Sequence, residues 1–189
     1  FSIISGLLLS FGWPPLPSVP LLFVGFVPIL FIENIISSNN KTNSNFQLLK
    51  YSYIAFLIWN AGTTWWVCNA SLPAGIFAIC ANALLMCIPI LLFHQTKKQM
   101  GESIGYASFI IFWLGFEYLH HEWELTWAWL TLGNGLSMFP EGIQWYQITG
   151  ALGGSLWALS VNLFLFFQIK GIWKAIAEKR FPAMEIARS

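Results

Sequence analysis

Residues 73–94 read PAGIFAICANALLMCIPILLFH, a run without any Asp, Glu, Lys or Arg. A helix needs about 20 mostly apolar residues to cross the hydrocarbon core of a bilayer. The run is long enough for that, and Pro89 within it is tolerated where neighbouring helices satisfy the freed backbone groups. Lys97 and Lys98 follow shortly after the apolar run. The stretch therefore predicts a transmembrane helix, with Lys97 and Lys98 in the loop that follows it.

Similar apolar stretches lie on both sides of this one. They cover residues 1–12, 19–36, 51–67, 104–119 and 148–169. The chain has 57% hydrophobic and 9% charged residues, whereas soluble domains have about 25% charged residues. Six spans use most of the 189 residues. The sequence therefore predicts an all-α, polytopic membrane helix bundle with six transmembrane helices, formed as one domain by residues 1–189.

The first stretch is shorter than the others. It begins at Phe1, inside an apolar run and without an initiator Met. It has neither the basic region nor the small-residue cleavage site that are typical of a signal peptide. We therefore expect residues 1–12 to be the remainder of a truncated first helix.

The basic residues lie on one side of such a bundle. The nine are Lys41, Lys50, Lys97, Lys98, Lys170, Lys174, Lys179, Arg180 and Arg188. The loops on the other side, about residues 13–18, 68–72 and 120–147, contain none. Since cytoplasmic loops retain basic residues, the pattern predicts a cytoplasmic C-terminal end. Because these residues are spread over three inner segments, we expect no nucleic-acid partner.

The cysteines and histidines do not form a recognisable reactive centre. Cys68 has no basic residue close in sequence that could activate its thiol, and Cys80 and Cys87 lie within an apolar helix. His120 and His121 are adjacent, so on a helix they point about 100° apart and rarely share one ion. The sequence predicts no catalytic nucleophile, no metal and no cofactor.

The tryptophans are concentrated on the predicted outer side. Seven of the eleven map to the outer boundary or the last outer loop: Trp13, Trp65, Trp66, Trp123, Trp127, Trp129 and Trp145. An ordinary aromatic belt would occupy both membrane interfaces. The excess on one side indicates a surface that either holds an amphipathic molecule, such as a lipid, or docks a further domain. The candidate residues of this lipid-facing outer mouth are Trp65, Trp66, Trp127, Trp129 and Leu130.

The apolar segment 125–136 is too short to span a bilayer. Its backbone groups need protein partners if it lies at membrane depth, and Gly133-Asn134-Gly135 predicts a turn. We therefore expect an outer re-entrant or interfacial aromatic loop.

Glu117 is an acid at the edge of the fifth predicted span, where a carboxylate is costly unless it is paired or neutral. On a helix it shares a face with Trp113 and His121, so a hydrogen bond between Glu117 and His121 is possible. We expect Glu117 and Asn134 to act as structural polar anchors for backbone groups of the outer loop.

Several motifs in order make the chain recognisable. They are residues 11–15, 25–28 with Glu33, 59–67 and 69–70, the helix centred on Glu117, and residues 127–134, 143–146, 149–150, 153–154 and 162. Together they resemble the N-terminal transmembrane domain of bacterial apolipoprotein N-acyltransferases, in particular the Bacteroidetes-type proteins. One departure is Ala128, where the family usually has a proline.

The resemblance implies an enzyme of the bacterial inner membrane. Such an enzyme transfers an acyl chain from a phospholipid to the N-terminal diacylglyceryl-cysteine of an apolipoprotein, so the implied partners are phospholipid, apolipoprotein and membrane lipids. The family's Glu-Lys-Cys triad belongs to a nitrilase-like domain that follows a seventh span. No residue up to Ser189 matches that triad, so we expect a chain truncated before the catalytic domain and inactive alone.

Two other functions remain open at the level of sequence. A six-span substrate-binding component of a small-molecule transporter would need converging polar groups, for which Glu117, Asn134 and Asn162 are candidates. A purely structural membrane module is the third possibility.

Overall fold

The structure is a computed structural model, and it describes residues 1–16, 18–39, 43–123 and 127–180. Within these ranges every regular element is a helix, which confirms the all-α class. The α-helices are α1 (Ser2–Phe11), α2 (Val27–Ser38), α3 (Ser44–Thr64), α4 (Leu72–Leu85), α5 (Cys87–Met100), α6 (Glu102–Glu122) and α7 (Tyr146–Arg180). Short 3-10 helices connect them: η1 (Val19–Phe23), η2 (Trp65–Asn69), η3 (Ala128–Leu130), η4 (Leu132–Met138) and η5 (Pro140–Ile143).

Three segments of the described chain are long and apolar enough to cross a membrane. They are Val19–Ser38, Leu72–Met100 and Tyr146–Ala177. The ten-residue α1 is apolar but shorter. Both α3 and α6 have 21 residues, but they are not among the segments that are apolar enough to span a membrane. Three of the six predicted spans therefore meet this criterion, and the count of six stays a prediction.

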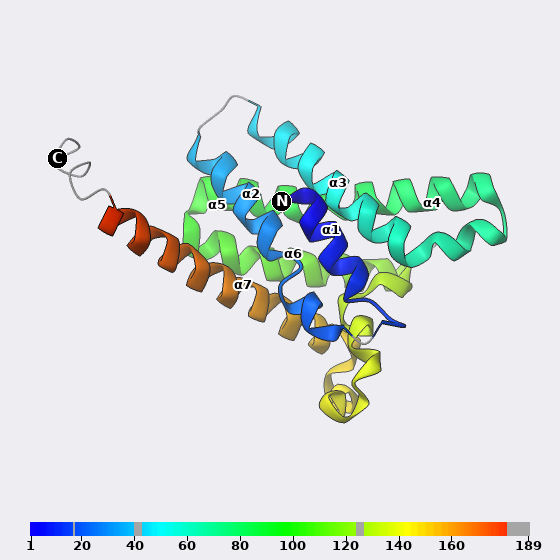
Figure 1. The fold of residues 1–189 in the computed structure, drawn as a ribbon. Helices are drawn as coiled ribbons and strands as arrows, with labels where there is room; N and C mark the ends of the chain where they lie inside the picture. The colour runs from blue at the N-terminus through cyan, green and yellow to red at the C-terminus, as the bar shows by residue number, and fades with distance from the viewer. Residues whose placement is uncertain (17, 40–42, 124–126, 181–189) are drawn as a thin grey trace.

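The helices pack as a bundle with two distinct ends (Figure 1). Helix α5 packs along α6, and α1 packs along α3, while α3 and α4 form a hairpin. We call the end formed by the last turns of α2 and α5, the start of α6 and the C-terminal part of α7 the lysine end, after Lys97, Lys98 and Lys170. The other end carries η2 and residues 127–143, and we call it the tryptophan end.

An aromatic cluster fills the core between α2, α3 and α6. The Phe26 ring meets Trp113 edge-on with centroids 4.6 Å apart, and Trp59 stacks on Trp113 at 6.4 Å. All three side chains are buried. Because aromatic side chains bury large apolar areas and prefer such offset and edge-on contacts, this cluster fixes α6 against the first half of the chain.

Two glycines allow the 3-10 segment to lie against α7. A Cβ atom at Gly133 would stand 1.9 Å from the Ala151 carbonyl oxygen, so only glycine permits this approach of η4 to α7. Gly150 has φ +64°, a conformation that other residues rarely adopt. It separates the first turn of α7 from the rest of that helix. The segment at the tryptophan end is thus packed on the bundle.

Candidate functional site at the tryptophan end

The structure brings several of the predicted outer aromatic residues together. Trp129 lies between Trp66 and Trp127, with ring centroids 4.9 Å and 5.2 Å away. Trp65 is well exposed beside Trp66. Leu130, which the sequence placed at the lipid-facing mouth, is instead 3% exposed and belongs to the hydrophobic core. The contact of Trp65, Trp66, Trp127 and Trp129 with lipid remains a prediction.

The segment between α6 and α7 is folded more regularly than a loop. Residues from Ala128 to Ile143 form the successive 3-10 helices η3, η4 and η5, and the predicted turn at residues 133–135 lies within η4. Leu125 and Thr126, also part of the predicted aromatic loop, lie outside the described residues. Since 3-10 helices satisfy part of their own hydrogen bonding, fewer backbone groups need partners from the rest of the protein.

Glu117 joins α6 to this segment. Its Oε1 accepts a hydrogen bond from the Leu132 N–H at 2.7 Å and another from the Trp113 Nε1–H at 2.9 Å. The carboxylate is buried, with Glu117 only 3% exposed. His121, a possible partner of Glu117 from the sequence, instead has its Nε2 2.8 Å from Thr131 Oγ1. Two residues of α6 therefore hold the same short stretch, residues 131–132.

Other polar side chains complete the attachment. The Asn134 Nδ2 donates to the Ala128 carbonyl at 3.0 Å, which closes the turn at the position where the sequence departs from the family's proline. The Gly133 N–H donates to Ser155 Oγ, and the Gly133 carbonyl accepts from the Tyr146 hydroxyl, each at 2.8 Å. Buried backbone groups are costly when unpaired, and these bonds provide partners from α7.

A chain of polar side chains that the sequence analysis missed crosses three helices beside this site. The Asn82 Nδ2 of α4 donates to Asn60 Oδ1 of α3 at 2.7 Å, and His120 Nε2 of α6 lies 2.9 Å from Asn82 Oδ1. All three side chains are buried. The sequence feature that could have indicated this chain is the position of Asn60 and Asn82 inside apolar stretches, where polar side chains often hydrogen-bond across helices.

An apolar groove runs along the neighbouring surface between α5 and α6. Its volume is about 600 Å³, within the range of about 300–1,000 Å³ found for ligand pockets. Most of the lining is aliphatic or aromatic, and the polar lining residues are at the tryptophan end. The lining residues are Leu85, Ile88, Pro89, Leu92, Ile111, Phe112, Gly115, Phe116, Leu119, His120, Glu122 and Trp123.

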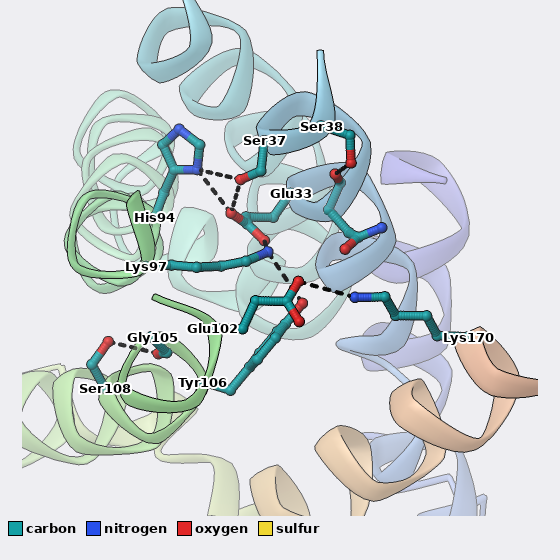
Figure 2. Close-up of polar contacts among 11 residues, drawn as sticks. Glu33, Ser37, Ser38, His94, Lys97, Glu102, Gly105, Tyr106, Ser108 and Lys170 are labelled. Carbon is teal, nitrogen blue, oxygen red and sulfur yellow. Dashed lines mark hydrogen bonds and ion pairs between the residues drawn. The ribbon is translucent and has the colours of Figure 1, made fainter. Parts of the chain in front are cut away.

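The lysine end contains a different buried polar group, centred on Glu33 (Figure 2). The Glu33 carboxylate accepts from Lys97 Nζ at 2.6 Å and from the Ser37 hydroxyl at 2.5 Å, and it lies 2.8 Å from His94 Nδ1. Lys97 Nζ also donates to the Tyr106 hydroxyl at 3.1 Å. The sequence placed Lys97 in an inner loop. In the structure it belongs to α5 and is buried, because its ammonium group pairs with Glu33 of α2.

The three polar residues that the transporter alternative requires are hydrogen-bonded to backbone groups in the structure. Asn162 is committed to the backbone of the first half of the chain, accepting from Phe26 N–H and donating to the Leu22 carbonyl, each at 2.8 Å. Glu117 and Asn134 are engaged with other backbone groups. Within the described ranges, no group of three or more His, Cys, Asp or Glu side chains is arranged to hold a metal ion.

Comparison with known proteins identifies the family. The profile of the apolipoprotein N-acyltransferase N-terminal domain matches residues 5–164. The chain is 28% identical, over 179 residues, to the apolipoprotein N-acyltransferase of Chlorobaculum tepidum. The match covers 89% of this chain and 32% of that relative, so the chain spans about a third of its length. No solved structure matches the chain. The chain therefore belongs to the apolipoprotein N-acyltransferase family, through the N-terminal domain of that family.

Proposed function

We propose that this chain is the membrane domain of an apolipoprotein N-acyltransferase, an enzyme that transfers an acyl chain from phospholipid to the N-terminal diacylglyceryl-cysteine of apolipoproteins. Its role is to hold the lipid substrates at the membrane surface, while the chemistry takes place in a nitrilase-like domain. The family match and the three apolar segments of membrane-spanning length support this proposal.

The proposed orientation follows from the charge distribution. We propose six spans in a bacterial inner membrane, with the lysine end in the cytoplasm and the tryptophan end at the outer surface. Basic residues favour the cytoplasmic side. Lys97 and Lys170 lie at one end of the bundle (Figure 2), and Lys98 follows Lys97 in α5. The aromatic residues Trp66, Trp127 and Trp129 would then lie at headgroup depth, where amphipathic rings are favoured.

The observation that carries the proposed role is the groove between α5 and α6. Its long apolar walls suit an acyl chain, and its polar residues His120 and Glu122 lie at the end proposed to face the headgroups. Burial of each CH₂ group contributes about 0.8 kcal/mol. The groove would therefore bind one acyl chain of a phospholipid mainly through its apolar wall.

Gly115 offers a direct test of the groove. It lies in the groove wall, and a Cβ atom there would meet nothing within 4 Å, so the side chain of Gly115→Leu has room to begin and adds bulk to the groove wall. Gly171 of α7 is equally open and does not line this groove, so Gly171→Leu is the matched control. The measurement is crosslinking of the purified protein to a phospholipid that carries a photoreactive group in its acyl chain.

We expect Gly115→Leu to reduce crosslinking within the groove about tenfold, which corresponds to the lost burial of about two CH₂ groups. Gly171→Leu should crosslink like the parent, with the labelled peptides mapping to α5 and α6. Equal labelling of the two variants at those peptides would show that the groove does not hold the acyl chain.

A further inference from the structure

A small cavity lies at the tryptophan end, beside the apolar groove, with which it shares the lining residues Phe116 and His120. The space open to the centre of a water-sized sphere is about 10 Å³, which is about the minimum needed to enclose one water. The cavity is bounded by α4, α6 and the segment that contains η3. Its lining residues are Asn82, Met86, Phe116, Glu117, His120, Trp127, Leu130 and Thr131.

Two buried polar atoms in residues of this wall have no hydrogen-bond partner within the described part of the chain. They are Glu117 Oε2, an acceptor, and Trp127 Nε1–H, a donor. The other carboxylate oxygen, Oε1, already accepts two hydrogen bonds. Burying such groups without a partner is unfavourable, and polar cavities of this size are where buried waters are found.

Neighbouring side chains of the described residues do not hydrogen-bond to Glu117 Oε2 or Trp127 Nε1. Ser155 lies close to the Glu117 carboxylate, but its hydroxyl accepts from the Gly133 N–H and is directed to the Ala151 carbonyl at 3.5 Å. His120 directs Nε2 to Asn82. A ligand that both accepts from an indole N–H and donates to a carboxylate would satisfy the two orphaned atoms.

We infer that the cavity is a binding site for one ordered water molecule that bridges Trp127 and Glu117. The water accepts a hydrogen bond from Trp127 Nε1–H and donates one to Glu117 Oε2. Glu117 of α6 then holds the chain on both sides of η3, through its direct contact with Leu132 and its water-mediated contact with Trp127. Phe116 and His120, which also line the apolar groove, separate the water from the proposed acyl chain.

The chain offers a matched control for this site. Trp59 is fully buried, and its Nε1–H also has no partner within the described residues, but Trp59 does not line the cavity. An indole N–H that is merely buried can thus be compared with one that faces the proposed water. Both can be observed in the same protein sample.

The experiment measures magnetisation transfer from water to the indole N–H hydrogens of the chain, labelled with nitrogen-15 and held in lipid nanodiscs. The Trp127→Phe and Trp59→Phe variants assign the two signals. We expect a nuclear Overhauser contact with a long-lived water at Trp127 and none at Trp59. The absence of this contact at Trp127 would overturn the inference, and equal contacts at both indoles would also overturn it, because they would indicate general penetration of water.

If Trp127→Phe does not fold, a crystal structure of the parent at a resolution that shows ordered solvent provides the second test. A density peak within hydrogen-bond distance of both Trp127 Nε1 and Glu117 Oε2 supports the site. A Ser155 hydroxyl turned to Oε2, with no such peak, overturns it.

Discussion

Two buried glutamates in the described part of the bundle, Glu33 and Glu117, have different kinds of partner. Glu33 at the lysine end lies in an ion pair with Lys97 and beside His94, and these two contacts join α2 to α5, while the Ser37 hydroxyl donates to Glu33 within α2. Glu117 at the tryptophan end accepts from an indole and a backbone N–H, both neutral donors. The first carboxylate therefore fixes helix against helix, and the second fixes a short 3-10 segment to a helix. The structural role of a buried glutamate is thus set by its hydrogen-bond partners.

The largest expected effect concerns the ion pair. Lys97→Met leaves the Glu33 carboxylate buried without its cation, and breaking a buried pair in this way costs about 3–5 kcal/mol. Thermal unfolding in detergent should therefore show a strong loss of stability. Combining Lys97→Met with Glu33→Gln should recover part of this loss, since the uncompensated charge is removed.

Lys98 provides the control for that prediction. It is the next residue of α5, but it is exposed, and its ammonium group donates a hydrogen bond to the Ser44 hydroxyl at 3.2 Å. Lys98→Met should change stability by less than about 0.5 kcal/mol. Equal losses for Lys97→Met and Lys98→Met would contradict the distinction between a buried and an exposed lysine.

The next effect concerns Glu117. Replacing it with Leu leaves the Leu132 N–H and the Trp113 indole without their acceptor, which should lower the stability of the solubilised domain by about 1–3 kcal/mol. Glu117→Gln should cost less, because its amide oxygen can still accept both bonds. If Glu117→Leu is as stable as the parent, the anchor role is wrong, and a functional role for the carboxylate becomes the better explanation.

A smaller effect is expected at the exposed aromatic contact. Trp129→Ala removes the ring contacts with Trp66 and Trp127, and an aromatic pair contributes about 0.5–1.5 kcal/mol beyond its buried area. The main result should be weaker retention of co-purified phospholipid, measured by mass spectrometry. The Trp173→Ala variant at the other end, where Trp173 is similarly exposed, should retain more lipid than Trp129→Ala.

The smallest effect concerns the exposed ion pair at the lysine end. Lys170 Nζ lies 3.1 Å from Glu102 Oε1, with both side chains accessible to the surroundings. Exposed pairs contribute about 0–1 kcal/mol. Lys170→Ala should therefore change the unfolding temperature far less than Lys97→Met, and a loss as large as that of Lys97→Met would show that burial does not decide the strength of these pairs.

The sequence predicted the parts of this molecule that depend on composition and local spacing. Apolar stretches predicted the helices, and the cost of an acid near the membrane singled out Glu117. The family motifs then placed the chain in the family that the comparison identifies. These inferences need no knowledge of which helices become neighbours.

Contacts between helices could not be predicted in the same way. Lys97 follows an apolar run, so the sequence placed it in a loop. Its partner, Glu33, is 64 positions away and could not be identified from local spacing. His121 was a reasonable partner for Glu117 by helical spacing. In the structure His121 instead contacts Thr131, because residues 127–132 fold back against α6. The buried position of Leu130 and the Asn60–Asn82–His120 chain likewise depend on packing of separate elements.

The central claim is that this chain holds the lipid substrates and does not carry out the chemistry. The most direct measurement is acyl transfer from phospholipid to a synthetic diacylated lipopeptide. The assay compares the chain alone with a fusion to the remaining two thirds of the Chlorobaculum tepidum relative. We predict turnover by the fusion, a decrease when the fusion carries Gly115→Leu, and none by the chain alone. Turnover by the chain alone would contradict the claim.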